Sequence, residues 1–138
     1  MRRVFVDNSY LVAILNPRDD RHQKAKEVSQ SLGNYLSVTS EMVLTEFLNH
    51  FCARGSSFRQ LAITATDKLC ADPDVEIIPQ TTEQVKQARL FYRKRLDKEY
   101  SLTDCVSMLI MEKMGIQDVL THDRHFQQAG FCALLRDD

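Results

Sequence analysis

The stretch that decides the fold is RRVFVDNSYLVAIL, residues 2–15. Its contiguous apolar residues 4–6 are β-prone and predict a short buried strand over residues 2–7. A second apolar run predicts a short helix over residues 10–15. Asp7 stands between the two runs, and burying a carboxylate there is costly unless another group compensates its charge. The first question that the sequence raises is therefore what Asp7 faces.

The remainder of the chain alternates short apolar segments with longer amphipathic ones. Further strands are expected over residues 35–38, 75–79, 118–123 and 131–135. Helices are expected over residues 21–32, 41–54, 58–71, 82–98, 101–115 and 124–130. Such alternation is typical of a parallel sheet that helices cover on both faces. The predicted fold is a three-layer α/β/α sandwich with a parallel sheet of about four or five strands.

Several of the expected helix ends carry capping signals. Ser9 is a candidate cap for the first helix, and Thr39 or Ser40 for the third. Gly55 is expected to close the third helix, because glycine readily adopts the left-handed conformation of a C-terminal cap. The long helix over residues 82–98 is expected to bury one face, made of Val85, Ala88, Tyr92 and Leu96.

Length and composition limit the class of protein. The chain has 138 residues, 43% of them apolar, which suits a single domain over residues 1–138. It has 18 Lys and Arg against 19 Asp and Glu, a balance that argues against strong non-specific binding of nucleic acid but allows a local basic patch. No run of about 18 apolar residues predicts a membrane helix. The four cysteines form no Cys-x-x-Cys pair, which favours a reducing, cytoplasmic location.

Four acidic residues lie in apolar surroundings at the ends of expected elements. Asp7 and Asp123 end the first and fourth strands, and ligands of open parallel sheets bind outside the carboxyl ends of the strands. Glu46 borders the apolar face of its helix, and Asp104 lies in the first turn of an apolar helix. Both helices begin just past a strand or a capping residue. We therefore expect all four acids at one end of the sheet.

Each of these acids also has an ordinary structural interpretation. Asp7 and Asp123 each suit a helix cap, and Ser101-x-x-Asp104 is a variant of the capping box. Glu46 suits a carboxylate that borders the core and stays in water. The set favours a shared site more strongly than any single member does, because all four positions agree on one end of the sheet.

Four carboxylates brought together repel and raise one another's pKa. Mg²⁺ and Mn²⁺ remove that repulsion, because these hard ions prefer carboxylate and water ligands. Ions held in this way neutralise charge on a phosphate and activate water. His122 and His125 do not predict zinc, because zinc sites usually need three or four protein ligands and no matching Cys or His cluster is evident.

Four stretches resemble the PIN-domain ribonucleases, most closely the VapC-type toxins of bacterial and archaeal toxin–antitoxin modules. These stretches are VFVDNSYLVAIL (4–15), VLTEFLNHF (43–51), SLTDCVSMLIMEKMG (101–115) and VLTHDRHF (119–126). The resemblance spans nearly the whole chain and implies an α/β/α fold and a Mg²⁺- or Mn²⁺-dependent endoribonuclease. The acids that the resemblance implies as catalytic and metal-binding fall on Asp7, Glu46, Asp104 and Asp123, and its supporting hydroxyl groups on Ser9 and Thr121.

The chain departs from this family after its first acid, where the family usually has Thr or Ser and this sequence has Asn8. An amide still forms hydrogen bonds, so Asn8 is expected to support the site. Arg124 and His125 follow the last acid directly and are candidate contacts for substrate phosphates. The basic residues of the long helix are interpreted as a solvated face.

The resulting hypothesis is in-line attack of water on an RNA phosphodiester, which leaves 5′-phosphate and 3′-hydroxyl ends. The resemblance also implies a homodimer and an antitoxin partner, the latter lying over the helices at residues 21–32 and 58–71. Two alternatives stay open from the sequence. One is a PIN-fold RNA-processing nuclease outside a toxin–antitoxin pair, and the other is a non-catalytic RNA- or protein-binding module.

Overall fold

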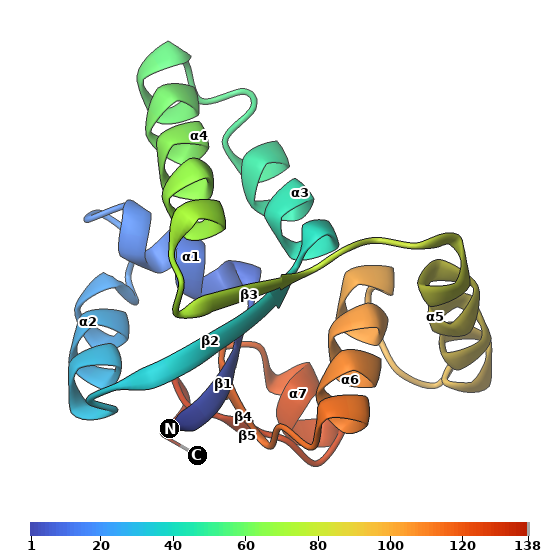
Figure 1. The fold of residues 1–138 in the computed structure, drawn as a ribbon. Helices are drawn as coiled ribbons and strands as arrows, with labels where there is room; N and C mark the ends of the chain where they lie inside the picture. The colour runs from blue at the N-terminus through green and yellow to red at the C-terminus, as the bar shows by residue number, and fades with distance from the viewer. Residues whose placement is uncertain (138) are drawn as a thin grey trace.

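A computed structural model describes residues 1–137 and contains one five-stranded sheet (Figure 1). The strands are β1 (Arg2–Val6), β2 (Tyr35–Ser40), β3 (Val75–Ile78), β4 (Asp118–Leu120) and β5 (Cys132–Ala133). Their order across the sheet is β3-β2-β1-β4-β5, and each neighbouring pair is parallel. The predicted α/β fold with a parallel sheet is confirmed.

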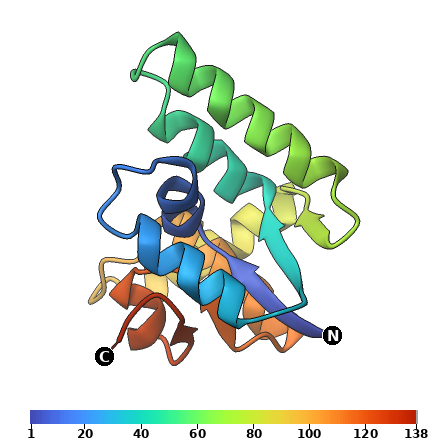
Figure 2. The ribbon, with the colours of Figure 1, turned by 90° about the vertical axis from the view of Figure 1, so that its left-hand side faces the viewer.

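The helices cover the sheet on both sides. They are α1 (Asn8–Leu15), α2 (His22–Ser31), α3 (Glu41–His50), α4 (Ser56–Ala71), α5 (Thr82–Lys94), α6 (Leu102–Met114) and α7 (Arg124–Gln128). α1 and α2 lie on one side, α5 and α6 lie on the other, and α3 and α4 form a hairpin that projects beyond the sheet (Figures 1 and 2). Within residues 1–137, no helix is both long and apolar enough to cross a membrane.

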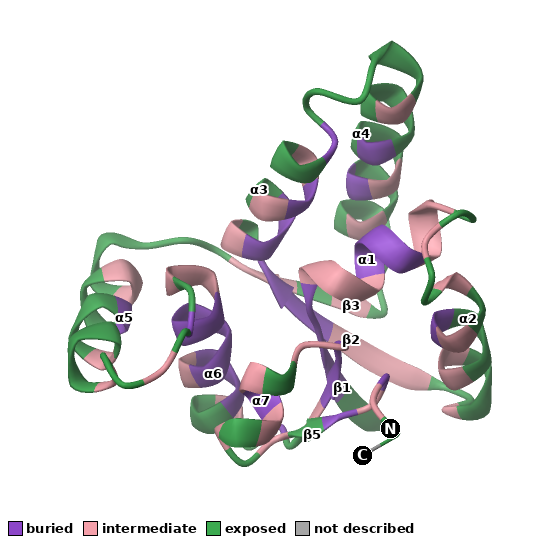
Figure 3. Cartoon of the chain, turned by 180° about the vertical axis from the view of Figure 1, so that it is seen from behind, coloured by how far each residue is buried: buried purple, intermediate pink, exposed green. Residues whose placement is uncertain are grey.

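The opening apolar run forms the central strand. Val4, Phe5 and Val6 of β1 are all buried, and Phe5 pairs with Val38 of β2 and Val119 of β4. A central parallel strand is covered on both faces, which is why its sequence is continuously apolar and not alternating. Figure 3 shows buried residues along β1 and along the part of β2 that leads into α3.

The strand order explains where a site can form. From β1 the chain adds β2 and β3 on one side, then returns to place β4 and β5 on the other. The direction of winding therefore reverses between β1 and β4. Loops that leave the carboxyl ends of two such strands diverge and open a crevice, which is the usual ligand position in open parallel sheets.

Local capping places the start of α3 as expected. Ser40 is the cap, because its Oγ accepts a hydrogen bond from the backbone N–H of Val43 at 3.1 Å. Thr39, the other candidate, instead donates its hydroxyl to the backbone oxygen of Val6 at 2.8 Å and ties β2 to β1. This fixed start sets the direction in which α3 leaves the sheet.

The expected end of α3 is wrong. The helix ends at His50, and Gly55, with φ of 90°, lies directly before α4 instead of closing α3. The reason is a contact between the two helices: Phe51 is buried and stacks on Phe58 of α4, with ring centroids 5.4 Å apart. This packing turns the chain earlier than the local sequence predicts.

The expected apolar face of α5 is only partly correct. Ala88 is buried, but Tyr92 is 47% exposed and Leu96 is 72% exposed. α5 ends at Lys94, and the chain then turns toward α6 with Arg95 and Asp97 forming an ion pair at 2.9 Å. Because the helix stops, Leu96 does not extend the face that Ala88 begins.

Candidate metal centre

Asp7 lies at the junction of β1 and α1 and is only 5% exposed. It occupies the N-cap position of α1, but its side chain makes no capping hydrogen bond, and the helix begins at Asn8. Instead, Asp7 Oδ2 accepts a hydrogen bond from Thr121 Oγ1 at 2.7 Å and one from Ser9 Oγ at 3.3 Å. Asp7 therefore faces the end of β4, and Ser9 joins this network instead of capping α1 as expected.

The loop after β4 is shaped by the same two hydroxyl groups. Ser9 Oγ accepts a hydrogen bond from the backbone N–H of His122, and Thr121 Oγ1 accepts one from that of Asp123, both at 3.1 Å. β4 ends at Leu120, earlier than expected, so Asp123 follows a short loop and not the strand itself. Asp123 also caps α7 through its Oδ1.

Asp104 takes part in the capping box of α6 and also belongs to the acidic cluster. Its Oδ2 accepts a hydrogen bond from the backbone N–H of Ser101 at 3.1 Å, and Ser101 Oγ accepts one from the N–H of Asp104 at 3.0 Å. The same Oδ2 lies 3.2 Å from His125 Nδ1, which is 3.1 Å from Asp123 Oδ1. The capping and clustering interpretations are therefore compatible.

Glu46 reaches the cluster from α3, where it is half-buried. The side chains of Thr103 and Asn8 lie beside its carboxylate, and both lower the pKa of Glu46. Thr103 was not recognised from the sequence, because a threonine inside a helix has no distinctive pattern and only the contact between α3 and α6 shows its role. Asn8, at which the chain departs from the family pattern, is one of these two residues beside Glu46. The buried Oδ1 of Asn8 has no hydrogen-bond partner within residues 1–137.

The pKa values show that the acids share one environment. Burial raises the pKa of Asp7 to about 6, with Glu46 and Asp123 adding to the rise and the Thr121 hydrogen bond opposing it. Burial also raises the pKa of Asp104 to about 6, and the charges of Asp7 and Asp123 contribute. The pKa of Glu46 is raised by burial and by the charges of Asp104 and Asp123. The structure thus brings together all four acids that the sequence singled out.

No lysine or arginine forms a salt bridge with these four acids within residues 1–137, and the basic partner that they have is His125. Arg124 is exposed beside Asp123. Asp104, Asp123 and His125 offer ligand atoms that all lie within 4.8 Å of one another. Clustered carboxylates without a lysine or arginine partner are a donor set that fits a hard divalent ion.

Comparison with known proteins agrees with this geometry. The model of the PIN domain family matches residues 4–131. The chain belongs to the PIN-domain family. This PIN domain is 33% identical over 131 residues to the protein named 23S rRNA-specific endonuclease VapC20 in two strains of Mycobacterium tuberculosis, CDC 1551 / Oshkosh and ATCC 25618 / H37Rv. Each alignment covers 93% of this chain and 95% of the relative.

The PIN domain also resembles a solved structure. The crystal structure of Mycobacterium tuberculosis VapC20, described as a sarcin–ricin loop cleaving toxin, superposes with a TM-score of 0.83 at 30% sequence identity. The match covers 93% of this chain and 95% of the VapC20 chain. The family match over residues 4–131 includes every one of the four acids.

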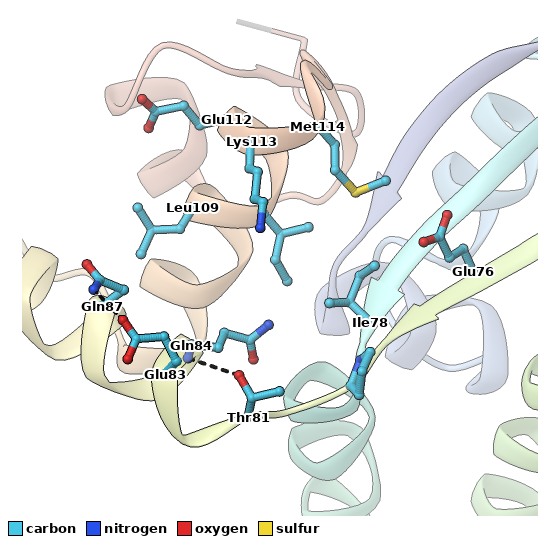
Figure 4. Close-up of a pocket in the computed structure, with 12 residues that line it drawn as sticks. Glu76, Ile78, Thr81, Glu83, Gln84, Gln87, Leu109, Glu112, Lys113 and Met114 are labelled. Atoms are coloured by element: carbon cyan, nitrogen blue, oxygen red, sulfur yellow. Dashed lines mark hydrogen bonds between the residues drawn. The ribbon is translucent and has the colours of Figure 1, made fainter.

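A groove of about 810 Å³ lies elsewhere in this PIN domain, between α5, α6 and β3 (Figure 4). Ile78, Leu109 and Met114 line it, and Thr81 at its rim caps α5 by accepting a hydrogen bond from the N–H of Gln84 at 3.0 Å. None of the four acids of the metal centre lines this groove. The candidate site is therefore identified by its convergent carboxylates and not by the size of a hollow.

Proposed function

We propose that this PIN domain is a divalent-metal-dependent endoribonuclease whose catalytic, metal-binding residues are Asp7, Glu46, Asp104 and Asp123. One observation carries the proposal: acids from four distant segments meet beside the carboxyl ends of β1 and β4, with the pKa values of the two most buried raised to about 6. A protein that only bound RNA would gain nothing from uncompensated carboxylates facing a polyanion. The membership of the chain in the PIN-domain family supports the same conclusion.

Mg²⁺ or Mn²⁺ is the cofactor that fits this donor set. Asp7 and Asp104 are the first candidates to hold it because they are the most buried of the four acids, and Glu46 and Asp123 complete the set. A bound ion of this kind supplies stabilisation of the negative charge on the phosphate and favours ionisation of the attacking water.

The remaining side chains position these acids and the substrate. Thr121 and Ser9 hold Asp7 through their hydroxyl groups, whereas Asn8 holds Glu46. Arg124 is exposed beside the cluster, which suits a contact with a substrate phosphate. His125, the second phosphate contact expected from the sequence, turns its Nδ1 toward Asp104 and Asp123.

The proposed reaction is hydrolysis of an RNA phosphodiester. Water attacks phosphorus in line, the bond between phosphorus and the 3′-oxygen breaks, and the leaving oxygen takes up a proton. The products carry 5′-phosphate and 3′-hydroxyl ends. The role of the chain is to hold the carboxylates close together in a site that is partly shielded from solvent, where electrostatic interactions with the phosphate are strong.

The substrate and partners follow from the named relatives. Because VapC20 is named as specific for 23S rRNA and described as cleaving the sarcin–ricin loop, 23S rRNA containing that loop is the first substrate to test. The likeness to a VapC toxin also supports a cytoplasmic toxin that forms a homodimer and is held by an antitoxin protein. A neighbouring gene whose small product copurifies with the chain and blocks cleavage would support the toxin assignment.

The activity is tested by incubating the purified chain with 23S rRNA and with a synthetic sarcin–ricin-loop RNA. We expect cleavage with Mn²⁺ or Mg²⁺, none with EDTA, and recovery when the ion is added back. The products should be degraded by a 5′-phosphate-dependent exonuclease. Binding of either RNA without cleavage under any divalent ion would favour the non-catalytic binding module instead.

A further inference from the structure

We propose that His125 is a direct ligand of the metal ion through its Nδ1 atom, and that this nitrogen makes the site prefer Mn²⁺ to Mg²⁺. The inference rests on the proposed carboxylate centre and adds a nitrogen donor to it. The sequence alone suggested a different role for His125, as a contact for substrate phosphates. In the structure, the imidazole Nδ1 of His125 instead faces the carboxylates of Asp104 and Asp123.

The first observation is the position of the imidazole nitrogen between two carboxylates. Nδ1 lies 3.2 Å from Asp104 Oδ2 and 3.1 Å from Asp123 Oδ1, and ligand atoms of the three side chains lie within 4.8 Å of one another. Neighbouring ligands of an octahedral ion with bonds of about 2.1 Å are about 3 Å apart. The nitrogen therefore has the spacing of a member of one coordination sphere with both acids.

The second observation is that Nδ1 approaches Asp123 more closely than a hydrogen bond with that residue accounts for. The Nδ1 contact with Asp104 is aligned as a hydrogen bond, whereas the Asp123 oxygen, although closer, forms no hydrogen bond with the ring. That oxygen accepts instead from the backbone N–H of His125 at 2.9 Å. A cation shared by the nitrogen and both carboxylates would account for the approach of Nδ1 to both oxygens.

The ring is held in this orientation by packing. The His125 side chain is 18% exposed, and the buried ring of Tyr100 meets it edge-on with centroids 5.7 Å apart. The backbone of His125 is fixed in the first turn of α7 by the Asp123 cap. A ring that packing holds toward the acids loses little conformational freedom when it binds an ion.

The preference for Mn²⁺ follows from the chemistry of the donors. Carboxylates bind Mg²⁺ and Mn²⁺ alike, whereas imidazole is a ligand of transition-metal ions. Mg²⁺ binds oxygen ligands and dehydrates reluctantly, so it gains little from the nitrogen. Adding one imidazole to the carboxylates therefore stabilises bound Mn²⁺ more than bound Mg²⁺.

The test measures metal binding and needs no RNA. Metal-free protein is titrated with Mn²⁺, free Mn²⁺ is followed by its electron paramagnetic resonance signal, and Mg²⁺ affinity is measured by competition. Pulsed spectra of the Mn²⁺ complex report coupling to ¹⁴N of a bound imidazole. The variants are His125→Ala and His125→Asp, and the control is His122→Ala, which removes the other histidine of the same loop.

We expect ¹⁴N coupling in the wild-type complex and in His122→Ala, and its loss in both His125 variants. The Kd for Mn²⁺ should rise about tenfold or more in His125→Ala, with a smaller change for Mg²⁺. His125→Asp should bind both ions but lose the preference for Mn²⁺. Metal binding by His125→Asp would show that the protein folds without the imidazole, and the far-ultraviolet circular dichroism of His125→Ala should match that of the wild type.

Two results would overturn the assignment of His125. One is Mn²⁺ bound by the wild type and lost in Asp7→Asn, but without ¹⁴N coupling; the nuclease proposal would then stand and only the role of His125 would fail. The other is coupling that persists in His125→Ala. If the wild type bound neither ion, both the assignment of His125 and the metal centre itself would be wrong.

Discussion

Asp7 is the residue at which burial and charge conflict most directly. Its carboxyl is 5% exposed, yet with a pKa of about 6 it is mostly ionised at neutral pH. Thr121 and Ser9 supply two hydroxyl groups to it, but no lysine or arginine pairs with it within residues 1–137. A residue in this situation is suited to hold a cation and is unfavourable for folding without one.

This conflict predicts that Asp7→Asn stabilises the metal-free protein at pH 8. The amide removes the buried charge and keeps an oxygen that accepts from Thr121, so the free energy of unfolding should rise by on the order of 1–3 kcal/mol. Urea unfolding in EDTA measures the change. Asp67→Asn, at an exposed acid of α4, should change stability little. A loss of stability in Asp7→Asn would contradict the account.

The pH dependence of stability has a definite sign. The pKa values of Asp7 and Asp104 in the folded protein are about 6, above their ordinary value of 3.8. The folded state therefore binds more protons than the unfolded state between these values, and the contribution of these groups falls as pH rises from about 4 to about 6. Urea midpoints measured in EDTA across this range should show a shallower decline in Asp7→Asn than in the wild type. Equal slopes would contradict the assignment.

Thr121 is predicted to act through Asp7. Thr121→Val keeps the shape of the side chain but removes the donor that lies 2.7 Å from Asp7 Oδ2. Hydrogen bonds to charged groups contribute about 1.5–3 kcal/mol, so kcat/KM for RNA cleavage should fall about tenfold or more. Thr121→Ser keeps the hydroxyl and should retain most activity. Full activity in Thr121→Val would remove Thr121 from the site.

At the scale of elements, α6 carries both Asp104 and Thr103 near its start, and its two ends are fixed in different ways. Its start is a capping box between Ser101 and Asp104, and its end is Gly115 in the left-handed conformation, with φ of 68°. Apart from the adjoining residues of the chain, no atom of residues 1–137 lies within 4 Å of the position that a Cβ at Gly115 would take. The glycine is therefore needed for its backbone conformation and not for space.

Gly115→Ala is predicted to lower the free energy of unfolding by about 1 kcal/mol, because a side chain disfavours positive φ. Urea unfolding measures the change, and Lys113→Ala on the exposed side of the same turn is the control. RNA cleavage under conditions where both variants stay folded should be unchanged, since Gly115 lies at the opposite end of α6 from Asp104. An unchanged unfolding midpoint in Gly115→Ala would contradict the conformational role.

The elements that sequence reasoning placed correctly are those with local signals. β1 is a contiguous apolar run, and α3 and α6 start at serine caps. The predicted element bounds are wrong where contacts between distant segments decide the structure. α3 ends early because Phe51 stacks on Phe58, and the extent of the buried face of α5 depends on where the chain turns toward α6.

In the site, too, the features with a local sequence signal were predictable and those set by contacts between distant segments were not. The convergence of the four acids was predictable, because the sequence places each of them near the end of an expected strand or at the start or border of an apolar helix. The partners of Glu46 were not, because Asn8 and Thr103 meet it only after three elements have packed. The inward orientation of His125 likewise depends on Tyr100 and the cap of α7, which no local pattern encodes.

At the scale of the whole molecule, the metal centre joins elements that are distant in the sequence. Asp7 follows β1, Glu46 lies in α3, Asp104 in α6, and Asp123 before α7. A bound ion would link these elements and stabilise the folded state by mass action, by about 2.7 kcal/mol when the ion is at a hundred times its Kd. The centre would thus contribute to stability as well as to catalysis.

This linkage predicts that Mn²⁺ raises the Tm of the wild-type protein by several degrees at pH 8. Asp7→Asn should show little response to the ion, although it is the more stable protein in EDTA. Differential scanning calorimetry with and without Mn²⁺ measures both effects, and Asp67→Asn should respond like the wild type. An equal rise in Asp7→Asn would place the bound ion elsewhere.

The central claim is that the carboxylate cluster holds the ion on which RNA cleavage depends. The most direct test is the rate of cleavage of 23S rRNA, measured against Mn²⁺ concentration, for the wild type, Asp7→Asn and Asp67→Asn. The account predicts that cleavage by the wild type and Asp67→Asn rises with Mn²⁺ and saturates, while Asp7→Asn is slower by at least about a hundredfold at every concentration. Cleavage by Asp7→Asn at the wild-type rate, or wild-type cleavage that persists in EDTA, would contradict it.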